Sequence, residues 1–143
     1  MDNVDKAKRS RHMAAVKSRG NASTERKMAI LLRQAGLHGW RRHYRIVGTP
    51  DFCWPKLRVA VFLDGCFWHG CPQCYKPPKS HVRFWARKVT MKRRRDRSVD
   101  RQLRLRGWRV LRIWECRIDA KSTVSRLRNA VALAIRGKLQ GKP

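Results

Sequence analysis

Two aspartates stand at the ends of segments whose composition is typical of neighbouring strands. Asp51 follows a Thr-Pro turn, and after twelve intervening residues Asp64 ends the apolar run that begins at Val59. If these strands form a hairpin, both carboxylates can face one divalent cation. Mg²⁺ prefers oxygen ligands and would offset the charge that develops on a phosphodiester during cleavage. Taken alone the pair is a weak sign of a nuclease, because a lone acid is usually a surface counterion.

Four of the five cysteines have the spacing of a metal site: Cys66, Cys71, Cys74 and Cys116. Two form a C-x2-C pair, one lies five residues upstream of it, and one follows the last predicted strand. Thiolates spaced in this way suit tetrahedral zinc, so we expect a structural Zn²⁺ that pins a loop to a strand end. Two alternatives stay open: His69 could replace one cysteine, and Cys66 or Cys116 could be a small buried apolar residue.

The net charge indicates a polyanionic partner. The chain has 36 Lys and Arg against 9 Asp and Glu, a formal charge of +27. Such a charge makes a compact protein repel itself unless a polyanion shares its surface, and solubility requires far less. Nucleic acid is therefore the leading partner. An anionic membrane is a weaker one, because the charge is spread along the chain and not gathered on one amphipathic helix.

Length and hydropathy limit the class of protein. At 143 residues the chain has the length of a single domain. No stretch reaches the roughly 18 apolar residues of a membrane span, and the first residues are basic with no apolar leader segment. We therefore expect a cytoplasmic, nucleoid-associated protein with no membrane partner. An odd number of cysteines favours metal or free thiols over a disulfide framework.

The elements that must position these residues are predicted in the order helix, strand, strand, strand, helix, strand, helix. They cover residues 23–35, closed by Gly36, then 42–48, 51–54, 57–63, 81–106, closed by Gly107, then 108–114, and a last helix from Ser122 or Thr123. The second and third strands read as a hairpin, with Cys53 in the core. This order predicts an α/β domain with one mixed central sheet flanked by helices.

Several stretches together resemble the very short patch repair (Vsr) endonucleases, a branch of the PD-(D/E)xK nuclease superfamily. They are RSRHMAAVKSR near the start, STE at 23–25, GTPDF at 48–52, VAVFLDGCFWHGCPQC at 59–74, FWARK at 84–88 and RDRSVDRQLRLRGWRVLRIWEC at 95–116. The strings DGCFWHGC and GWRVLRIWEC are the most specific. The resemblance implies a restriction-endonuclease-like fold with a structural zinc loop. It also implies an enzyme that nicks one DNA strand beside a T:G mismatch, of the kind left when 5-methylcytosine deaminates.

The resemblance implies a role for each residue that matches a family motif. Asp51 corresponds to the principal Mg²⁺ ligand, Leu63 to a residue that lends its backbone carbonyl to the cation, and His69 to the catalytic histidine. Asp64 stands where the superfamily places its second acid. The lysine expected two residues later is Cys66, which we assign to zinc. His69 can take over the work of that lysine, because an imidazole holds or passes a proton near neutral pH.

Five further residues receive roles from the resemblance, and four of them have an alternative. Glu25 and Asp96 correspond to supporting acids around metal-bound waters, or else serve as a helix cap and an internal ion pair. Phe67 and Trp68, with Trp85, correspond to a wedge inserted between base pairs beside the mismatch, where unstacking is easiest. The alternative places the first two rings in the core.

The resemblance also divides the chain into three parts. Residues 22–118 are the expected nuclease domain, residues 119–143 a C-terminal helix with a basic tail, and residues 1–21 a basic arm or short helix. The arm supplies phosphate contacts through Arg9, Arg11 and Lys17. The expected partner is double-stranded DNA with a T:G mismatch, bound by a monomer, with other repair proteins as further partners.

Two rival functions stay open. One is a nuclease of the same fold with a different substrate preference. The other is a non-catalytic, zinc-containing module that binds nucleic acid. The rival module would be expected to have lost Asp51, Asp64 or His69, and the sequence keeps all three.

Overall fold

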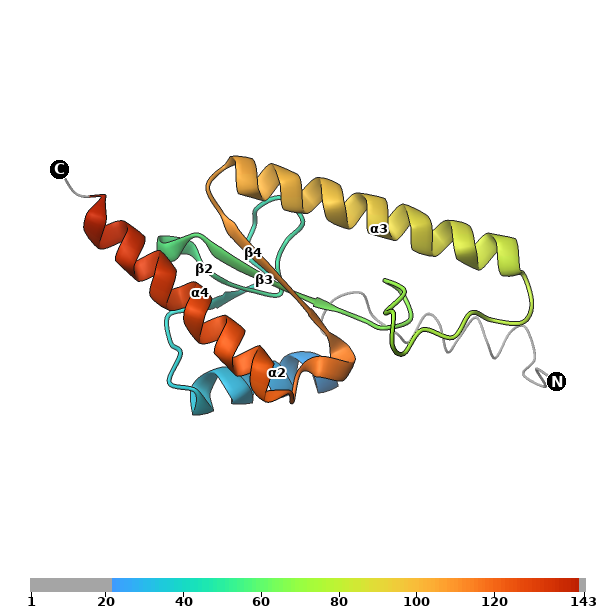
Figure 1. Cartoon of the computed structure of the whole chain (residues 1–143), viewed down its shortest axis with the longest axis horizontal. Helices are drawn as coiled ribbons and strands as arrows, with labels where there is room; N and C mark the ends of the chain where they lie inside the picture. Colours follow the sequence, from blue (N-terminus) through green and yellow to red (C-terminus); the bar gives the residue numbers. More distant parts are fainter. Residues whose placement is uncertain (1–21, 142–143) are drawn as a thin grey trace.

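The computed structural model describes residues 22–141. The predicted arm, with Arg9, Arg11 and Lys17, lies outside these residues. The main elements are α2 (Ala22–Gln34), β1 (Arg41–Arg42), β2 (Phe52–Trp54), β3 (Val59–Asp64), α3 (Val82–Leu105), β4 (Arg109–Trp114) and α4 (Lys121–Gln140). Short 3-10 turns follow β2 and β4, at Pro55–Leu57 and Glu115–Arg117. Figure 1 shows α3 along one side of the strands, with α2 and α4 on the other.

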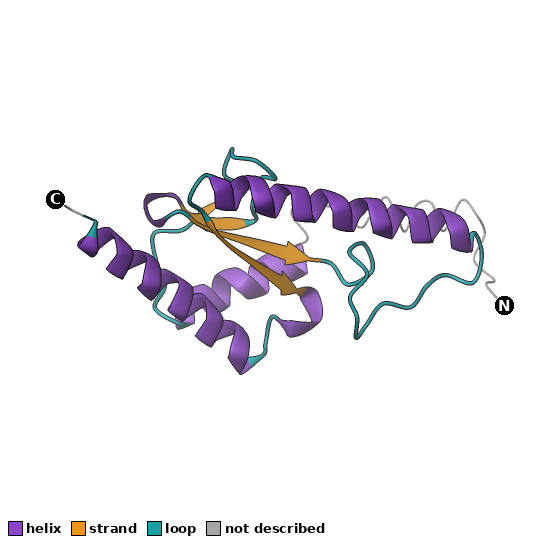
Figure 2. Cartoon of the chain, turned by 45° about the horizontal axis from the view of Figure 1, so that its top comes forward, coloured by secondary structure: helices purple, strands orange, loops and turns teal. Residues whose placement is uncertain are grey.

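The sheet has the order β1-β2-β3-β4 and is mixed, as the sequence predicts. Strands β2 and β3 pair antiparallel with Cys53 opposite Ala60, which confirms the predicted hairpin. Strands β3 and β4 pair parallel, with Arg112 opposite Phe62 and Trp114 opposite Asp64. This parallel register places the C-terminal ends of β3 and β4 side by side, and α3 is the connection that crosses between them (Figure 2).

Strand β3 is buried on both faces, which explains its uninterrupted apolar run. Val59 and Val61 pack into a core with α2 and α4, whereas Ala60 and Phe62 pack beneath α3. Because side chains alternate along a strand, Asp64 also lies on the α3 face. The predicted burial of Cys53 is confirmed, since its side chain is fully buried.

The strand predicted over residues 42–48 is wrong. Only Arg41–Arg42 pairs with β2, and the following residues form bends and turns. His43 has φ 51° and Gly48 has φ 77°, left-handed conformations that a strand cannot contain. A Cβ on Gly48 would lie 2.3 Å from the Val99 side chain, so glycine lets this loop approach α3 closely.

The helix ends largely follow the sequence. Gly36 and Gly107, with φ 72° and 83°, follow the ends of α2 and α3 as predicted. Helix α4 begins at Lys121, slightly earlier than expected. The Thr123 hydroxyl is buried and donates to the backbone carbonyl of Arg117 at 2.6 Å, which ties α4 to the turn after β4. Among residues 22–141 no helix is both long and apolar enough to cross a membrane.

Candidate active site

A polar cavity of about 150 Å³ lies at the C-terminal end of β3. Its lining comes from the loop before β2, from β3, from the loop after β3, from α3 and from β4: Gly48, Thr49, Asp51, Phe62, Leu63, Asp64, His69, Lys92, Arg95, Asp96, Val99 and Arg112. Four predicted catalytic residues and Leu63 therefore line one cavity, together with three basic residues. Glu25 is the predicted catalytic residue outside this lining.

Asp51 is fixed by the β2-β3 hairpin. Its Oδ2 accepts a hydrogen bond of 2.8 Å from the backbone N–H of Leu63. Burial raises the pKa of the Asp51 carboxyl from 3.8 to about 6, although the Leu63 N–H acts to lower it. A half-buried carboxylate that is costly to charge is a site where a bound cation is stabilising.

Glu25 lies beside Asp51 at the start of α2. Its carboxylate is almost fully buried, pairs with the Arg42 guanidinium and lies 2.9 Å from His43 Nε2. One potential ligand atom each from Glu25, His43 and Asp51 lies within 4.8 Å of the others. Glu25 thus forms an ion pair, and the same carboxylate lies at the edge of the Asp51 site.

His69 is held by two aspartates. Its Nδ1 lies 2.5 Å from Asp96 Oδ2, on α3, and 3.7 Å from Asp64 Oδ1, at the end of β3. Burial acts to raise the pKa of Asp96, but the hydrogen bond and charge of His69, with the charges of Arg112 and Lys92, lower it overall. Burial raises the pKa of Asp64, against the attraction of His69 and Arg112. Asp96 is therefore the carboxylate more firmly ionised beside the imidazole.

Sequence reasoning missed Arg112, which lies in the centre of β4. Its Nη1 donates to Asp64 Oδ1 at 2.9 Å, and its Nε donates to Asp100 Oδ1 at 2.8 Å. Asp100 has a side chain only 14% exposed and belongs to this cluster. The sequence did contain a signal for Arg112, because it is a charged residue among the apolar residues of the alternating strand β4.

The four cysteines of the predicted metal site come together. Their sulfur atoms all lie within 4.8 Å of one another, with 3.7 Å between Sγ of Cys71 and Sγ of Cys116. Tetrahedral zinc with Zn–S bonds of about 2.3 Å places sulfurs roughly 3.8 Å apart, so this donor set fits the ion. His69 lies outside the cluster, because its Nδ1 is engaged by Asp96. The four thiols thus join the loop after β3 to the turn after β4.

The predicted wedge residues form one aromatic cluster. The ring of Phe67 lies 5.3 Å from that of Trp68 and 5.4 Å from that of Trp85, each edge to face. Tyr75 and Phe84, which sequence reasoning missed, extend the cluster on either side. All three predicted rings are partly exposed, so the alternative that placed Phe67 and Trp68 in the core is wrong.

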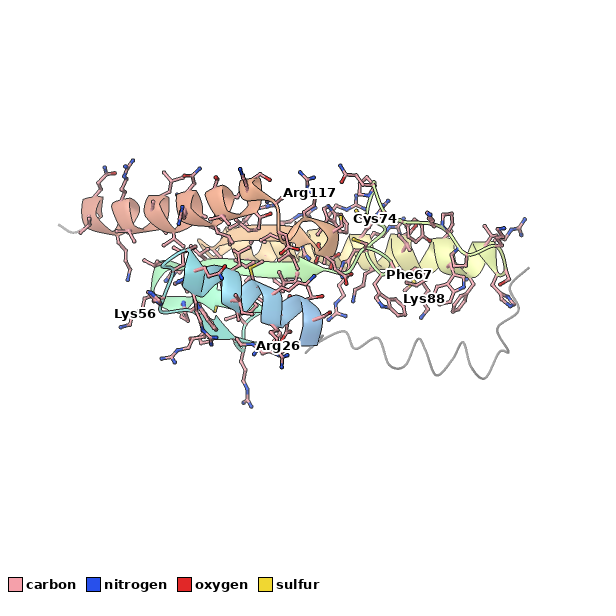
Figure 3. The ribbon with its side chains drawn as sticks, turned by 90° about the horizontal axis from the view of Figure 1, so that it is seen from below. Arg26, Lys56, Phe67, Cys74, Lys88 and Arg117 are labelled. Atoms are coloured by element: carbon pink, nitrogen blue, oxygen red, sulfur yellow. The ribbon has the colours of Figure 1, made fainter. Side chains whose placement is uncertain are left out.

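The cluster adjoins a basic helix. Figure 3 shows Phe67 and Lys88 on the same side of the molecule. The Nζ of Lys88 lies 5.6 Å from the centre of the Phe84 ring. The exposed basic residues of α3 are Arg83, Arg87, Lys88, Arg93, Arg94, Arg95, Arg97, Arg101 and Arg104. Aromatic rings beside cationic side chains form a surface suited to stacked bases and phosphates.

Comparison with known proteins identifies close sequence relatives. A family model described as "DNA mismatch endonuclease Vsr" matches residues 1–76. "DNA mismatch endonuclease Vsr" of Escherichia coli (strain K12) is 37% identical over 123 residues, covering 85% of this chain and 78% of the relative. "Type II nicking enzyme V.XorIIP" of Xanthomonas oryzae pv. oryzae is 35% identical over 132 residues, covering 90% and 95%. "Type II nicking enzyme V.NmeDIP" of Neisseria meningitidis serogroup C is 35% identical, covering 92% and 90%.

Proposed function

We propose that this chain, which belongs to the DNA mismatch endonuclease Vsr family and is a DNA endonuclease, nicks one strand of duplex DNA beside a T:G mismatch in a Mg²⁺-dependent reaction. The observation that carries the proposal is the meeting of Asp51 and the His69–Asp96 pair in one small polar cavity. A carboxylate for a hard cation and an oriented imidazole are the parts that phosphodiester hydrolysis requires.

The residues at Asp51 fit Mg²⁺. The carboxylate of Asp51 is anchored through one oxygen to Leu63 N–H, and Leu63 lines the same cavity. Oxygen donors from a carboxylate and a carbonyl are those that Mg²⁺ prefers. When bound there, the ion supplies charge stabilisation for the phosphate and a more acidic water. The protein's part is to hold Asp51 rigidly through the hairpin.

His69 is placed to handle a proton. With Nδ1–H donating to Asp96 Oδ2, the Nε2 atom keeps a lone pair that can accept a proton from the attacking water. The negative charge of Asp96 stabilises the imidazolium that results, as the aspartate does in a serine protease triad. Asp64 Oδ1 lies 3.7 Å from His69 Nδ1 and accepts a hydrogen bond from Arg112, so we assign Asp64 to the support of His69.

The four-cysteine cluster is proposed to hold a structural Zn²⁺. It connects Cys66, Cys71 and Cys74 of one loop to Cys116 after β4, and the same loop carries His69 and two of the wedge residues, Phe67 and Trp68. Arg93 of α3 adds a second anchor by donating to the backbone carbonyls of His69 and Gly70. A site with four protein thiolates has no open position for substrate, so its role is to fix the loop.

Mismatch selectivity is proposed to come from the aromatic cluster. Insertion of Phe67, Trp68 and Trp85 between base pairs costs a few kcal/mol of lost stacking, and less where a mismatch has already weakened the stack. The relative from Escherichia coli is named a DNA mismatch endonuclease, which supports a mismatched duplex as the substrate. Several relatives are named type II nicking enzymes, so a nicking enzyme with another sequence preference is the second candidate.

The deciding experiment is cleavage of paired duplexes of identical flanking sequence, one fully matched and one with a single T:G pair, in Mg²⁺. We expect one nick, in one strand, on the T:G duplex only. Equal nicking of both duplexes would favour the second candidate. No nicking of any duplex by zinc-loaded protein that still binds DNA would indicate the non-catalytic module. Asp51→Asn serves as the inactive control in each reaction.

A further inference from the structure

We infer that Arg112 is a positioning residue of the active site, which holds the carboxylates of Asp64 and Asp96 in place around His69. The inference rests on the proposed function and deepens it. It assigns a role to a residue in the centre of β4 that lines the active-site cavity and that sequence reasoning missed. We assign a positioning role because the nitrogen atoms of the Arg112 guanidinium already have partners within the protein.

Every nitrogen of the Arg112 guanidinium has a carboxylate or carbonyl partner. Nη1 lies 2.9 Å from Asp64 Oδ1 and 3.5 Å from Asp96 Oδ1. Nε lies 2.8 Å and 3.1 Å from the two oxygens of Asp100. Nη2 lies 2.8 Å from Asp100 Oδ1 and 3.3 Å from the backbone carbonyl of Asp96. With its donors engaged in this way, Arg112 cannot act as a free ligand for a DNA phosphate, and its action must pass through the aspartates.

The surroundings keep the guanidinium in one orientation. The Arg112 side chain is 20% exposed, and its guanidinium carbon lies 4.4 Å from the centre of the Phe62 ring. The parallel register of β3 and β4 places Phe62 directly opposite Arg112, so the contact is built into the sheet. A planar guanidinium suits this position because it stacks on a ring and binds carboxylates through its edge.

Without Arg112 the carboxylates would repel one another. Asp64, Asp96 and Asp100 have side chains 6%, 18% and 14% exposed, so water screens them poorly. Removing one partner of such a cluster leaves uncompensated buried charge. The group that still contacts both Asp64 and Asp96 is then His69, whose Nδ1 lies 3.7 Å from Asp64 Oδ1 and 2.5 Å from Asp96 Oδ2. The two aspartates would then compete for this one atom, and the imidazole would lose its single orientation.

Four variants test this role. Arg112→Met removes the positive charge and the forked set of N–H donors. Arg112→Lys keeps the charge but can hold only part of the cluster. Asp100→Asn loosens the far side of the guanidinium without touching His69. Arg109→Met, which changes an exposed arginine of the same strand outside the cavity, is the matched control.

Two measurements are made on each zinc-loaded variant that keeps a cooperative thermal transition. The first is the single-turnover nicking rate at saturating protein, with duplex affinity measured separately. The second is the ¹⁵N–¹H spectrum of the imidazoles, in which the His69 Nδ1–H signal is assigned by comparison with His69→Gln. A residue that served only stability would leave this signal unchanged in a folded variant.

We expect Arg112→Met to lower the nicking rate about 100-fold, and Arg112→Lys and Asp100→Asn about 10-fold, at unchanged duplex affinity. The His69 signal should shift or broaden in Arg112→Met and stay in place in Arg109→Met. A rate within about threefold of the wild type in Arg112→Lys and Asp100→Asn would overturn the role even if Arg112→Met fails to fold. An unchanged His69 signal in folded Arg112→Met would also overturn it.

The outcomes separate this inference from the proposed function. If the wild-type protein nicks no duplex, the proposed function fails, and the His69 signal decides on the positioning role by itself. If the wild type nicks T:G duplex and Asp51→Asn does not, while Arg112→Met nicks normally, the proposed function stands and the role of Arg112 is rejected.

Discussion

His69 Nδ1 lies 2.5 Å from Asp96 Oδ2, a contact that joins residues 27 positions apart in the chain. The imidazole belongs to the loop after β3, which the thiol cluster joins to the turn after β4. The carboxylate belongs to the middle of α3. The thiol cluster and the long helix thus set the orientation of one imidazole. Loss of either partner should therefore reduce catalysis without removing the surface that binds DNA.

The first prediction concerns this pair. Asp96→Asn keeps the size of the side chain but removes the charge that stabilises the imidazolium, and the amide can present N–H to Nδ1 and select the wrong tautomer. We expect the single-turnover nicking rate to fall roughly 100- to 10,000-fold. Duplex affinity, measured separately, should change little, because an acidic side chain such as Asp96 does not itself bind the DNA phosphates. A nicking rate close to that of the wild type would exclude His69 as the proton acceptor.

The second prediction concerns the stability of the protein without Mg²⁺. Burial raises the pKa of Asp51 from 3.8 to about 6, so the folded protein binds more protons than the unfolded chain between these values. Stability from this group is fully present below about pH 4 and is lost as the pH rises through about 6. Asp51→Asn cannot ionise and still accepts the Leu63 N–H.

At pH 8, zinc-loaded and Mg²⁺-free Asp51→Asn should therefore be more stable than the wild type by about 1 to 3 kcal/mol. Thermal unfolding at pH 8 and at pH 4.5 measures the difference, which should shrink at the lower pH. Added Mg²⁺ should raise the Tm of the wild type but not of the variant. A variant less stable than the wild type at pH 8 would show that the ionised Asp51 carboxylate does not destabilise the folded protein. The same variant should nick no DNA.

The third prediction distinguishes the clustered cysteines from the core cysteine. Cys116→Ser removes the thiol through which the turn after β4 joins the cluster, so zinc content should fall and unfolding should occur at much lower temperature. Structural zinc contributes on the order of 10 kcal/mol of apparent binding free energy. Cys53→Ala removes one buried sulfur and should cost only about 1 to 2 kcal/mol, with zinc content unchanged. Elemental analysis and thermal unfolding of both variants provide the comparison, and a fully folded wild type without zinc would contradict it.

The fourth prediction separates mismatch recognition from general affinity. Trp68→Ala should lose about 1 to 3 kcal/mol of binding to T:G duplex and much less on matched duplex, since the ring is inserted only at the mismatch. Arg87→Ala, on the exposed face of α3, should weaken both duplexes alike and reduce the salt slope by about 0.9. The quantity to measure is the ratio of the two affinities at fixed salt. An unchanged ratio in Trp68→Ala would place discrimination elsewhere.

Phe84 provides a further test of the aromatic surface. Phe84 is 52% exposed, and the centre of its ring lies 5.1 Å from that of Trp85. If the ring stacks on a base or supports the wedge, Phe84→Ala should lower the T:G-to-matched affinity ratio by less than Trp68→Ala does. The expected loss is roughly 1 kcal/mol, measured by titration of both duplexes. A loss equal on both duplexes would assign Phe84 to general binding.

The sequence by itself determined the parts that depend on neighbouring residues. The C-x2-C spacing, the apolar run of β3, the length of α3 and the glycines after the helices each state a local preference, and all are present in the structure. The net charge likewise predicts a polyanionic partner, because it depends only on composition and not on how the chain folds. Asp51 and Asp64 were identified because a hairpin brings strand ends together by local geometry.

Only the tertiary structure decided which acids have partners. Arg112 and Asp64 are 48 residues apart, and they meet because the parallel register of β3 and β4 sets one strand beside the other. Residues 42–48 have the composition of a strand, yet packing of this loop against α3 overrides it through the left-handed backbone at Gly48. Composition and spacing describe single segments, whereas ion pairing in a buried cluster depends on how segments are docked, which no local pattern encodes.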